Sequence, residues 1–305
     1  MTNIPLYMAP LQGYTDAAWR NAHHAVFGGV TMYYSPFIRL ESGDCRRRDI
    51  ADISADRNTA PLTPQLLGCK AEDAKKIAER IVELGFKAID INLGCPFPPI
   101  ARHHKGSGLL CYPEEVEAML IALSGIKGIT YSVKMRIGYE KPDDWKRIMP
   151  LFSIINPDHI TIHPRIGTQQ YKGELLMDQF KEIYDSAPYP LIFNGDVMNS
   201  EAIAKISAEF PRLKGIMLGR GILCNPALSA PEKATSENFS KFHELIYSDY
   251  QARLQGGDSQ LLTKMKSMWD YFLIDADHKL HKKILKANKL NDYLSAVENL
   301  FSSME

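Results

Sequence analysis

Eight short runs of β-forming residues alternate with helix-forming segments along most of the chain. The β-like runs span residues 4–9, 30–36, 62–67, 88–92, 131–136, 159–163, 191–194 and 215–218. The helix-compatible segments between them include residues 71–84, 113–123, 145–155, 177–186 and 200–210. Strands that alternate with helices of about 10 to 15 residues form parallel βαβ units. Eight such units close into a barrel, so the sequence predicts an α/β fold, a (β/α)8 TIM barrel over residues 1–228.

The alternation ends near Pro226, and a linker of small, proline and polar residues follows at 229–236. Helices are then expected at residues 237–254, 259–274, 279–287 and 292–304. A unit of about 70 residues buries little apolar surface by itself. We therefore predict a small all-helical carboxyl-terminal domain over residues 237–305 that packs on the barrel.

Charge and cysteine content narrow the class of protein. The 36 Lys and Arg residues balance the 36 Asp and Glu residues, so any nucleic-acid contact must come from a local basic patch. The five cysteines form no Cys-x-x-Cys pair, which favours neither a disulfide framework nor a metal site. No signal peptide and no apolar run of 18 residues is found. We expect a soluble cytoplasmic protein, and nothing in the sequence indicates a protein partner.

Polar side chains gather at the ends of successive predicted strands, where the reactive groups of a barrel lie. Cys95 follows one such strand in an Asn-x-Gly-Cys-Pro turn, in which Gly94 permits a sharp bend and Pro96 prevents the strand from continuing. Each polar residue alone has a structural explanation, whereas their joint occurrence favours an active site. The set comprises Gln65, Asn92, Cys95, Lys134, Arg136, His163, Asn194, Gly195 and Asp196. The other four cysteines are expected to be structural.

The last predicted strand runs directly into Gly219-Arg220-Gly221. In barrels, the loops after the seventh and eighth strands often bind phosphate through backbone N–H groups and a helix amino terminus. Arg220 adds a charge-assisted contact. Together with the turn after the seventh strand, this segment predicts a phosphorylated cofactor. No Gly-x-Gly-x-x-Gly fingerprint follows the first strand, so a Rossmann unit is not indicated.

Seven short motifs follow one another along the chain: APLQGYTD at 9–16, QLLG at 65–68, DINLGCP at 90–96, GSGLL at 106–110, VKMRIG at 133–138, NGD at 194–196 and GRG at 219–221. This ordered series resembles that of the tRNA-dihydrouridine synthases over about residues 4–226. Downstream, KMKSMW at 264–269 resembles the helical RNA-binding domain of the bacterial members. The resemblance implies an FMN-dependent oxidoreductase that takes electrons from NADPH and reduces particular uridines of tRNA to 5,6-dihydrouridine.

The resemblance also implies roles for individual residues. Those expected to line the flavin are Pro10, Leu11, Gln12, Gln65, Lys134 and His163, with Gln65 and Lys134 on the isoalloxazine ring. Those expected to hold the ribityl phosphate are Asn194, Gly195, Asp196, Gly219 and Arg220. Cys95 is expected to be the proton donor, and Asn92 and Arg136 to contact the uracil.

The sequence departs from the family's pattern in three places. Leu11 stands where Met is usual, which is harmless if the backbone makes the contact. The segments IARHHK at 100–105 and HPRIGT at 163–168 also differ, and both lie near the expected substrate mouth. They bear on which uridine is reduced more than on the chemistry.

The chemistry itself supports the role of Cys95. Reducing the uracil C5–C6 bond takes a hydride at C6 and a proton at C5, and reduced flavin N5 supplies only the hydride. A thiol with an unperturbed pKa of about 8.5 is mostly protonated at neutral pH and serves as a general acid. Lys134 beside the flavin would stabilise the anionic reduced ring.

A stacked uracil reaches a flavin at the bottom of a barrel only when its nucleotide is flipped out, which requires a grip on tRNA elsewhere. Four lysines at i, i+3, i+4 and i+7 form one helical stripe: Lys279, Lys282, Lys283 and Lys286. A basic stripe is often only a solvated face. On a neutral chain we predict that it contacts phosphates. Lys264 and Lys266 join it by resemblance, whereas residues 46–48 are expected to be ordinary surface.

Two other functions stay open from the sequence. One is a flavin barrel that acts on a small molecule, as dihydroorotate dehydrogenases and old-yellow-type enzymes do, and the lysine stripe weighs against it. The other is a tRNA-binding folding helper, against which the intact Cys95 and flavin set weigh. The position of the reduced uridine and the oligomeric state are not indicated.

Overall fold

The barrel closes through a strand that is divided by a proline. The computed structural model describes residues 4–304, and its main sheet has nine parallel strands in the order β5-β2-β1-β11-β10-β9-β8-β7-β6. They are β1 (Leu6–Met8), β2 (Met32–Tyr34), β5 (Leu62–Thr63), β6 (Gln65–Leu67), β7 (Ala88–Leu93), β8 (Thr130–Gly138), β9 (Ile160–Ile166), β10 (Leu191–Asn194) and β11 (Gly215–Leu218). The end strands β5 and β6 are consecutive in the chain and separated only by Pro64, which has no N–H for the ladder. The eight expected strands and the TIM barrel are thus confirmed.

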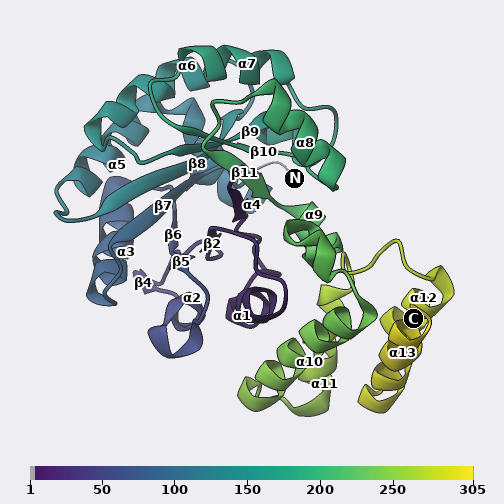
Figure 1. The fold of residues 1–305 in the computed structure, drawn as a ribbon. Coiled ribbons are helices and arrows are strands. Elements are labelled where there is room, and N and C mark those ends of the chain that lie inside the picture. Colours follow the sequence, from purple (N-terminus) through teal and green to yellow (C-terminus); the bar gives the residue numbers. More distant parts are fainter. Residues whose placement is uncertain (1–3, 305) are drawn as a thin grey trace.

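Helices surround the sheet as amphipathic covers (Figure 1). The principal ones are α1 (Ala17–Val26), α3 (Ala71–Glu83), α5 (Pro113–Ser124), α7 (Met177–Ser186), α8 (Ser200–Glu209) and the short α9 (Arg220–Cys224). In α3 the buried residues Ala74, Ile77, Ala78 and Ile81 recur at helical spacing and face the sheet. The same period in the other segments explains why the sequence identified most of these helices.

Two parts of the barrel region differ from the expectation. The helix expected over residues 145–155 ends after one turn as α6 (Trp145–Ile148) and continues as a 3-10 segment (Met149–Ile154), because Pro150 cannot donate the next α-helical hydrogen bond. The connection after β2 holds a hairpin of β3 (Leu40–Glu41) and β4 (Asp44–Cys45) and the helix α2 (Arg47–Ile53). These elements are too short to give a periodic signal in the sequence.

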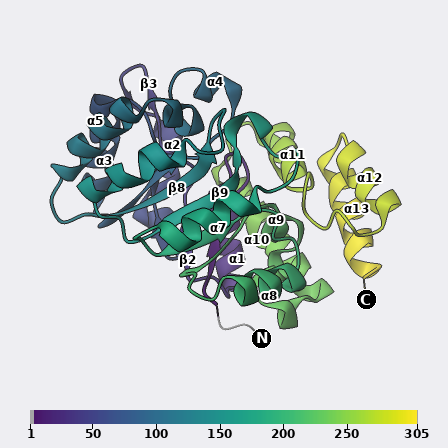
Figure 2. The same cartoon turned by 90° about the horizontal axis from the view of Figure 1, so that it is seen from above.

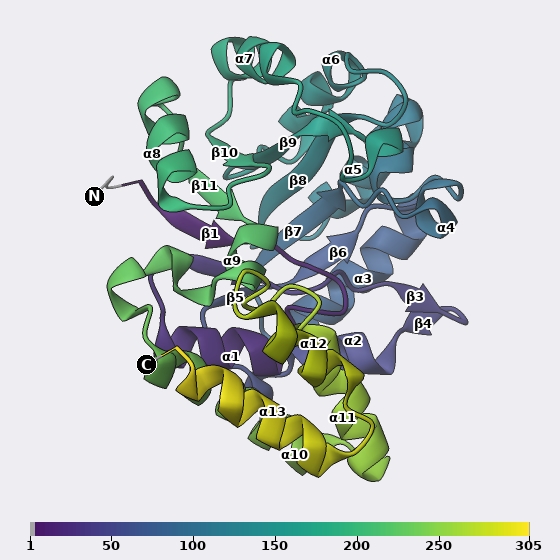
Figure 3. The ribbon, with the colours of Figure 1, turned by 90° about the vertical axis from the view of Figure 1, so that its right-hand side faces the viewer.

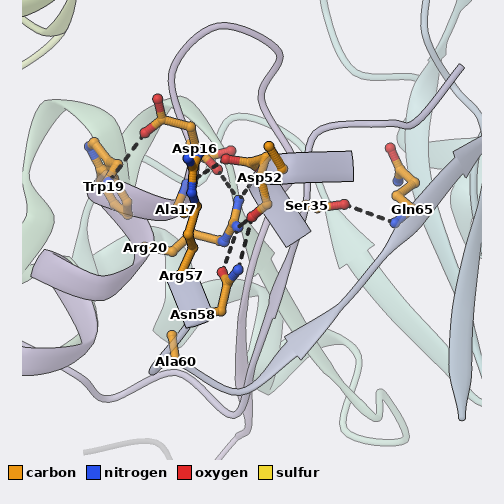
Figure 4. A network of polar contacts seen from close by, with 12 residues as sticks. Asp16, Ala17, Trp19, Arg20, Ser35, Asp52, Arg57, Asn58, Ala60 and Gln65 are labelled. Carbon is orange, nitrogen blue, oxygen red and sulfur yellow. Dashed lines mark hydrogen bonds and ion pairs between the residues drawn. The ribbon is translucent and has the colours of Figure 1, made fainter. Parts of the chain in front are cut away.

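A buried polar network fixes the loop that joins β1 to α1 (Figure 4). The guanidinium of Arg20 is fully buried and donates from Nη1 to the Thr15 carbonyl at 2.8 Å and to Asp52 Oδ2 at 2.9 Å. Its Nη2 donates to Asn58 Oδ1 at 2.7 Å. The same Asp52 accepts from the backbone N–H of Ala17 at 2.7 Å, at the start of α1. The loop that leaves the carboxyl end of β1 is therefore held at its far end by a paired, buried charge.

The carboxyl-terminal region is helical as expected, with α10 (Ser236–Arg253), α11 (Gly257–Met268), α12 (His278–Lys286) and α13 (Leu290–Ser302). The helix expected over 259–274 ends early at Met268, and the backbone N–H of Leu273 then donates to the Cys224 carbonyl of α9 at 2.9 Å. Figures 1 to 3 show these helices clustered on one side of the barrel, beside α1. Trp19 of α1 meets Phe242 of α10 edge to face, with ring centroids 5.4 Å apart. Residues 1–3 and 305 of the two predicted domains lie outside the described residues.

Polar contacts add to this packing. Both carboxylate oxygens of Asp16, before α1, accept from the hydroxyl of Tyr250 at 2.9 Å, and Lys264 of α11 lies 3.2 Å from Asp16 Oδ2. The hydroxyl of Tyr14 donates to Asp270 at 3.2 Å. Among residues 4–304, no helix is both long enough and apolar enough to span a membrane.

Candidate active site at the carboxyl ends of the strands

One cavity at the carboxyl ends of the strands gathers nearly all of the site residues predicted for the barrel. Those that line it are Pro10, Leu11, Gln12, Asn92, Cys95, Lys134, Arg136, His163, Asn194, Gly195, Asp196, Gly219 and Arg220. Gln65 is the exception, because its buried side chain lies below the lining, where it bonds to Asp90 and Asn92. Parallel strands bring residues far apart in sequence to one rim, as the fold predicts.

The Cys95 turn is held from both sides. Asn92 Oδ1 accepts from the backbone N–H groups of Gly94 at 3.0 Å and Cys95 at 2.8 Å. The hydroxyl of Ser107 donates to the Cys95 carbonyl at 2.9 Å. Gly106 has a φ of +57°, and a Cβ there would come within 2.9 Å of the Cys95 Cβ, so only glycine permits this close approach. The thiol thus has a fixed position in the cavity wall.

Burial raises the pKa of Cys95, although a backbone N–H at Phe97 and the cations Arg136 and Lys134 act in the opposite direction. The thiol is therefore protonated at neutral pH. A protonated thiol is the form that donates a proton.

The cavity is electropositive. Its cations are Lys134, Arg136 and Arg220, and among residues 4–304 Asp196 is the only acidic one in its lining. Burial, and then the neighbouring Arg136, lower the pKa of Lys134 to about 8. No hydrogen bond or ion pair joins its ammonium group to another of residues 4–304. Burial and the surrounding cations also hold the pKa of His163 well below its usual value, so its ring is neutral at neutral pH.

The two segments expected to bind phosphate do meet. Asp196 has a φ of +46° after Gly195 and accepts from Arg220 Nη2 at 2.5 Å. It also forms a two-bond ion pair with the buried Arg165. A Cβ at Gly221 would lie 2.1 Å from the Val197 carbonyl, so glycine is required where α9 approaches the turn after β10. Burial would raise the pKa of Asp196, but the hydrogen bond from Arg165 and the charges of both arginines lower it overall, so the carboxylate is ionised.

Several residues of the site were not identified from the sequence. Arg165 holds Asp196, and Tyr171 lies against two cations, with its ring centroid 5.5 Å from the guanidinium carbon of Arg136 and 5.0 Å from that of Arg220. Arg165 lies within β9, whereas Tyr171 follows β9 in a segment without periodic pattern. Arg165 stands two residues after His163, so alternation along the strand was the one available signal.

A second, outer cavity adjoins the first and shares Leu11, Gln12, Cys95, Tyr171 and Arg220 with it. Its remaining lining is largely aromatic and basic: Tyr14, Arg39, Arg48, Phe97 and Tyr271 belong to it. Phe97 is 57 % exposed and Tyr171 48 % exposed, which is unusual for rings of this size. Tyr271 comes from the helical region, so both parts of the chain form this entrance. The remaining cysteines line neither cavity.

The predicted lysine stripe forms one exposed face of α12. Lys279, Lys282, Lys283 and Lys286 line a shared groove against α13, while Ile284 on the opposite face is buried. The two lysines of α11 are engaged within the chain instead. Lys264 pairs with Asp16, and Lys266 donates to the Ala287 carbonyl at 2.9 Å.

Comparisons with known proteins agree with this geometry. The family model described as Dihydrouridine synthase (Dus) matches residues 7–302. A probable tRNA-dihydrouridine synthase 2 of Bacillus subtilis (strain 168) is 33 % identical over 244 residues, covering 77 % of this chain and 73 % of that protein. A tRNA-dihydrouridine synthase B of Pasteurella multocida (strain Pm70) is 28 % identical over 224 residues, covering 73 % and 67 %.

Among solved structures, the old yellow enzyme homologue from Zymomonas mobilis superimposes with a TM-score of 0.50. It is 12 % identical, and the match covers 76 % of this chain and 90 % of that one. At this identity the likeness concerns the barrel fold alone. The family model, which spans almost the whole chain, is decisive: the protein belongs to the dihydrouridine synthase family.

Proposed function

We propose that this dihydrouridine synthase reduces uridines of tRNA to 5,6-dihydrouridine, with FMN as bound cofactor and NADPH as reductant. One observation carries the proposal: the protonated thiol of Cys95 and the unpaired ammonium group of Lys134 share one cavity. Reduction of the C5–C6 bond needs a proton donor and a cation that stabilises the reduced electron carrier. This cavity offers both.

The residues present fit a flavin mononucleotide. An anionic ring next to Lys134 would favour the charged lysine, which burial now disfavours. Gly219 leaves space open at the rim, since a Cβ there would come no closer than 3.8 Å to Asn194 Nδ2. We assign Pro10, Leu11, Gln12, Lys134 and His163 to the ring, and Asn194, Gly195, Gly219 and Arg220 to the phosphate. Asp196 would act by holding Arg220 toward the phosphate, since a carboxylate itself repels one.

Cys95 donates its proton to uracil C5 in this proposal. When bound and reduced, FMN would supply the hydride that this reaction needs. The thiol is suited to the task because burial keeps it protonated, while Asn92 and Ser107 fix its backbone. Arg136 lies in the same wall, with Nε donating to the Gly94 carbonyl at 3.1 Å and Nη1 to the Ile166 carbonyl at 2.9 Å, and its pKa of about 10 leaves it charged. It is placed to neutralise charge that develops on a uracil oxygen. Uracil contact by Asn92, and flavin contact by Gln65 from below the lining, stay predictions.

The outer cavity suits a base that has left its stack. Exposed aromatic rings such as Phe97 and Tyr171 provide faces on which a flipped base stacks, and each such contact is worth about 1–3 kcal/mol. We propose that the lysine face of α12 binds tRNA phosphates farther away. A small-molecule substrate would need neither this aromatic entrance nor the basic face, which is why we favour tRNA.

Two measurements test the function. Mass spectrometry of tRNA from a deletion strain should show loss of dihydrouridine at one or more positions, and their return when the wild-type chain is restored. Acid-released cofactor should be FMN, because the cavity offers one phosphate-binding rim. Unchanged tRNA in the deletion strain would contradict the substrate assignment, and FAD would contradict the phosphate assignment.

A further inference from the structure

A chain of buried hydrogen bonds runs from inside the barrel to the Cys95 turn. Asp90 on β7 is fully buried, and its Oδ2 accepts from Gln65 Nε2 at 2.6 Å. Gln65 Oε1 in turn accepts from Asn92 Nδ2 at 2.7 Å. Asn92 Oδ1 then accepts from the backbone N–H groups of Gly94 and Cys95. Three side chains on two adjacent strands thus connect the barrel interior to the turn that carries the thiol.

At both ends of this series of hydrogen bonds, the roles of donor and acceptor are fixed. Burial raises the pKa of Asp90, while the hydrogen bonds from Gln65 and Ser132 favour its ionised form. An ionised carboxylate oxygen only accepts, and a backbone N–H only donates. The two amides between them, Gln65 and Asn92, can each face either way when considered alone. Only one pair of orientations satisfies both ends, namely the one observed. Ser132 donates to the other oxygen of Asp90 at 2.6 Å, so that oxygen is also occupied.

We call this series of hydrogen bonds from Asp90 through Gln65 to Asn92 the relay. The surrounding residues keep its side chains in place. The backbone N–H of Gln65 donates to the Ser35 hydroxyl at 3.0 Å, which Figure 4 shows beside the Arg20 network. Gln65 is fully buried and Asn92 is 7 % exposed, so water cannot readily replace either amide partner. An unpaired buried amide here would carry a desolvation cost, which makes the relay cooperative.

We infer that Asp90 is a positioning residue for the Cys95 thiol, acting through Gln65 and the orientation of the Asn92 amide. It touches neither cavity itself. The inference rests on the proposed role of Cys95 as proton donor. It requires that Asp90 act as a hydrogen-bond acceptor, whereas its charge, which also attracts Lys134, is not needed to hold the turn.

Two substitutions separate acceptor from charge. Asp90→Asn keeps an acceptor oxygen, because Asn can turn Oδ1 toward Gln65 and Nδ2 toward the Ser132 hydroxyl. Asp90→Leu keeps the branching of the side chain but removes every acceptor. Ser132→Ala is the matched control, since it removes a partner of Asp90 outside the relay.

The first readout is alkylation of Cys95, followed by peptide mass spectrometry in the purified full-length protein. We expect Asp90→Leu to label Cys95 about tenfold faster, because the turn loses two backbone hydrogen bonds, whereas Asp90→Asn and Ser132→Ala label within about twofold of wild type. The second readout is single-turnover uridine reduction in the FMN-loaded enzyme. It should fall about 10- to 100-fold in Asp90→Leu, because the thiol is misplaced, with flavin reduction by NADPH little changed.

Equal labelling of Asp90→Leu and wild type would overturn the inference. So would an Asp90→Asn variant as impaired as Asp90→Leu, which would show that charge matters. Where Asp90→Leu does not fold, Gln65→Met breaks the relay one step further on and must give the same faster labelling. Labelling does not depend on activity, so a wild-type enzyme that reduces no uridine would refute the proposed function and leave this test intact.

Discussion

The barrel cavity and the lysine face of α12 use positive charge in opposite ways. In the cavity, Lys134 is a partly exposed part of the wall, and the burial it does have lowers its pKa to about 8. On α12, four lysines stand in solvent along one groove. A buried cation acts over a few ångströms and is weakly screened, whereas exposed cations act together and lose strength with salt. We therefore expect the cavity cation to act on a single bound group, and the four exposed lysines to act together on a polyanion.

The largest effect is expected in the cavity. Replacing Cys95 by Ala should slow uridine reduction about 10²- to 10⁴-fold, the usual worth of a positioned general acid. Flavin reduction by NADPH should be unchanged, because it needs no proton from this thiol. Stopped-flow absorbance separates the two half-reactions. Cys111→Ala, which alters a half-buried thiol outside both cavities, is the control. Equal loss in both half-reactions would mean that Cys95 supports the cofactor instead.

The second prediction concerns the buried charge of Lys134. Its pKa is about 8 in the folded protein and 10.5 in the unfolded chain, so the unfolded chain binds more protons between these values. Stability therefore rises with pH across this window, and below pH 8 the fold bears the full cost of burying the ammonium group. In cofactor-free protein, Lys134→Met should be more stable than wild type below pH 8, by at most about 3 kcal/mol.

That advantage should disappear by about pH 10.5, as urea unfolding of wild type and variant at several pH values would show. Lys205→Met on the exposed face of α8 is the control for a solvated lysine. A difference between wild type and Lys134→Met that stays constant with pH would contradict the contrast between buried and exposed cations.

The two regions also differ in how far the sequence predicted them. The cavity residues could be predicted because parallel strands place their carboxyl ends at one rim of the barrel. Asn92, Lys134 and His163 therefore lie together as a result of the topology. The lysine stripe on α12 could be predicted from helical periodicity, and its lysines are exposed to solvent as expected. In both regions a regular element carries the residues.

What the sequence did not predict depends on tertiary contacts. Tyr171 reaches the cavity from a loop whose path is fixed by Arg165, which donates to the Gly173 carbonyl at 2.7 Å. The relay through Gln65 depends on which strands neighbour β7. Lys264 was assigned to tRNA by resemblance, whereas its observed partner is Asp16, more than 200 residues away in sequence. No local pattern reports such pairings.

The third prediction tests the exposed side of the comparison. Replacing Lys279, Lys282, Lys283 and Lys286 together by Gln should weaken tRNA binding about tenfold and flatten its salt dependence. Each lost phosphate contact retains about 0.7 to 0.9 counterion, so the slope of log K against log salt should fall by a few units. Filter binding at several salt concentrations measures both quantities.

Flavin content and NADPH oxidation should stay as in wild type. Short uridine-containing fragments should be affected less than whole tRNA, since they cannot reach from the cavity to α12. Gln at Lys75, Lys146, Lys181 and Lys205, which are exposed on the outer barrel helices, controls for net charge. If both fourfold variants give the same slope of log K against log salt, the lysine face of α12 is ordinary surface, and other residues bind the tRNA phosphates.

The smallest effect is expected where the barrel meets the carboxyl-terminal helices, at the ion pair of Asp16 and Lys264. Asp16→Asn keeps an acceptor for Tyr250 and remains a good N-cap for α1, but it loses the ion pair, whose side chains are 24 % and 28 % exposed. We expect a loss of about 0.5–1 kcal/mol in the free energy of unfolding, typical of a partly solvated pair. Asp16→Ala also removes the cap and the Tyr250 bond, and should cost about 1–2 kcal/mol more. Urea unfolding orders the two variants by stability, and tRNA affinity shows whether the ion pair has a further role.

If Lys264 serves only to join the helices to the barrel, Asp16→Asn leaves tRNA affinity within about twofold of wild type, because exposed pairs contribute little beyond their own contact. A clear rise in affinity would instead show that Asp16 competes with a tRNA phosphate for Lys264, and the basic surface would then extend from α12 to the barrel.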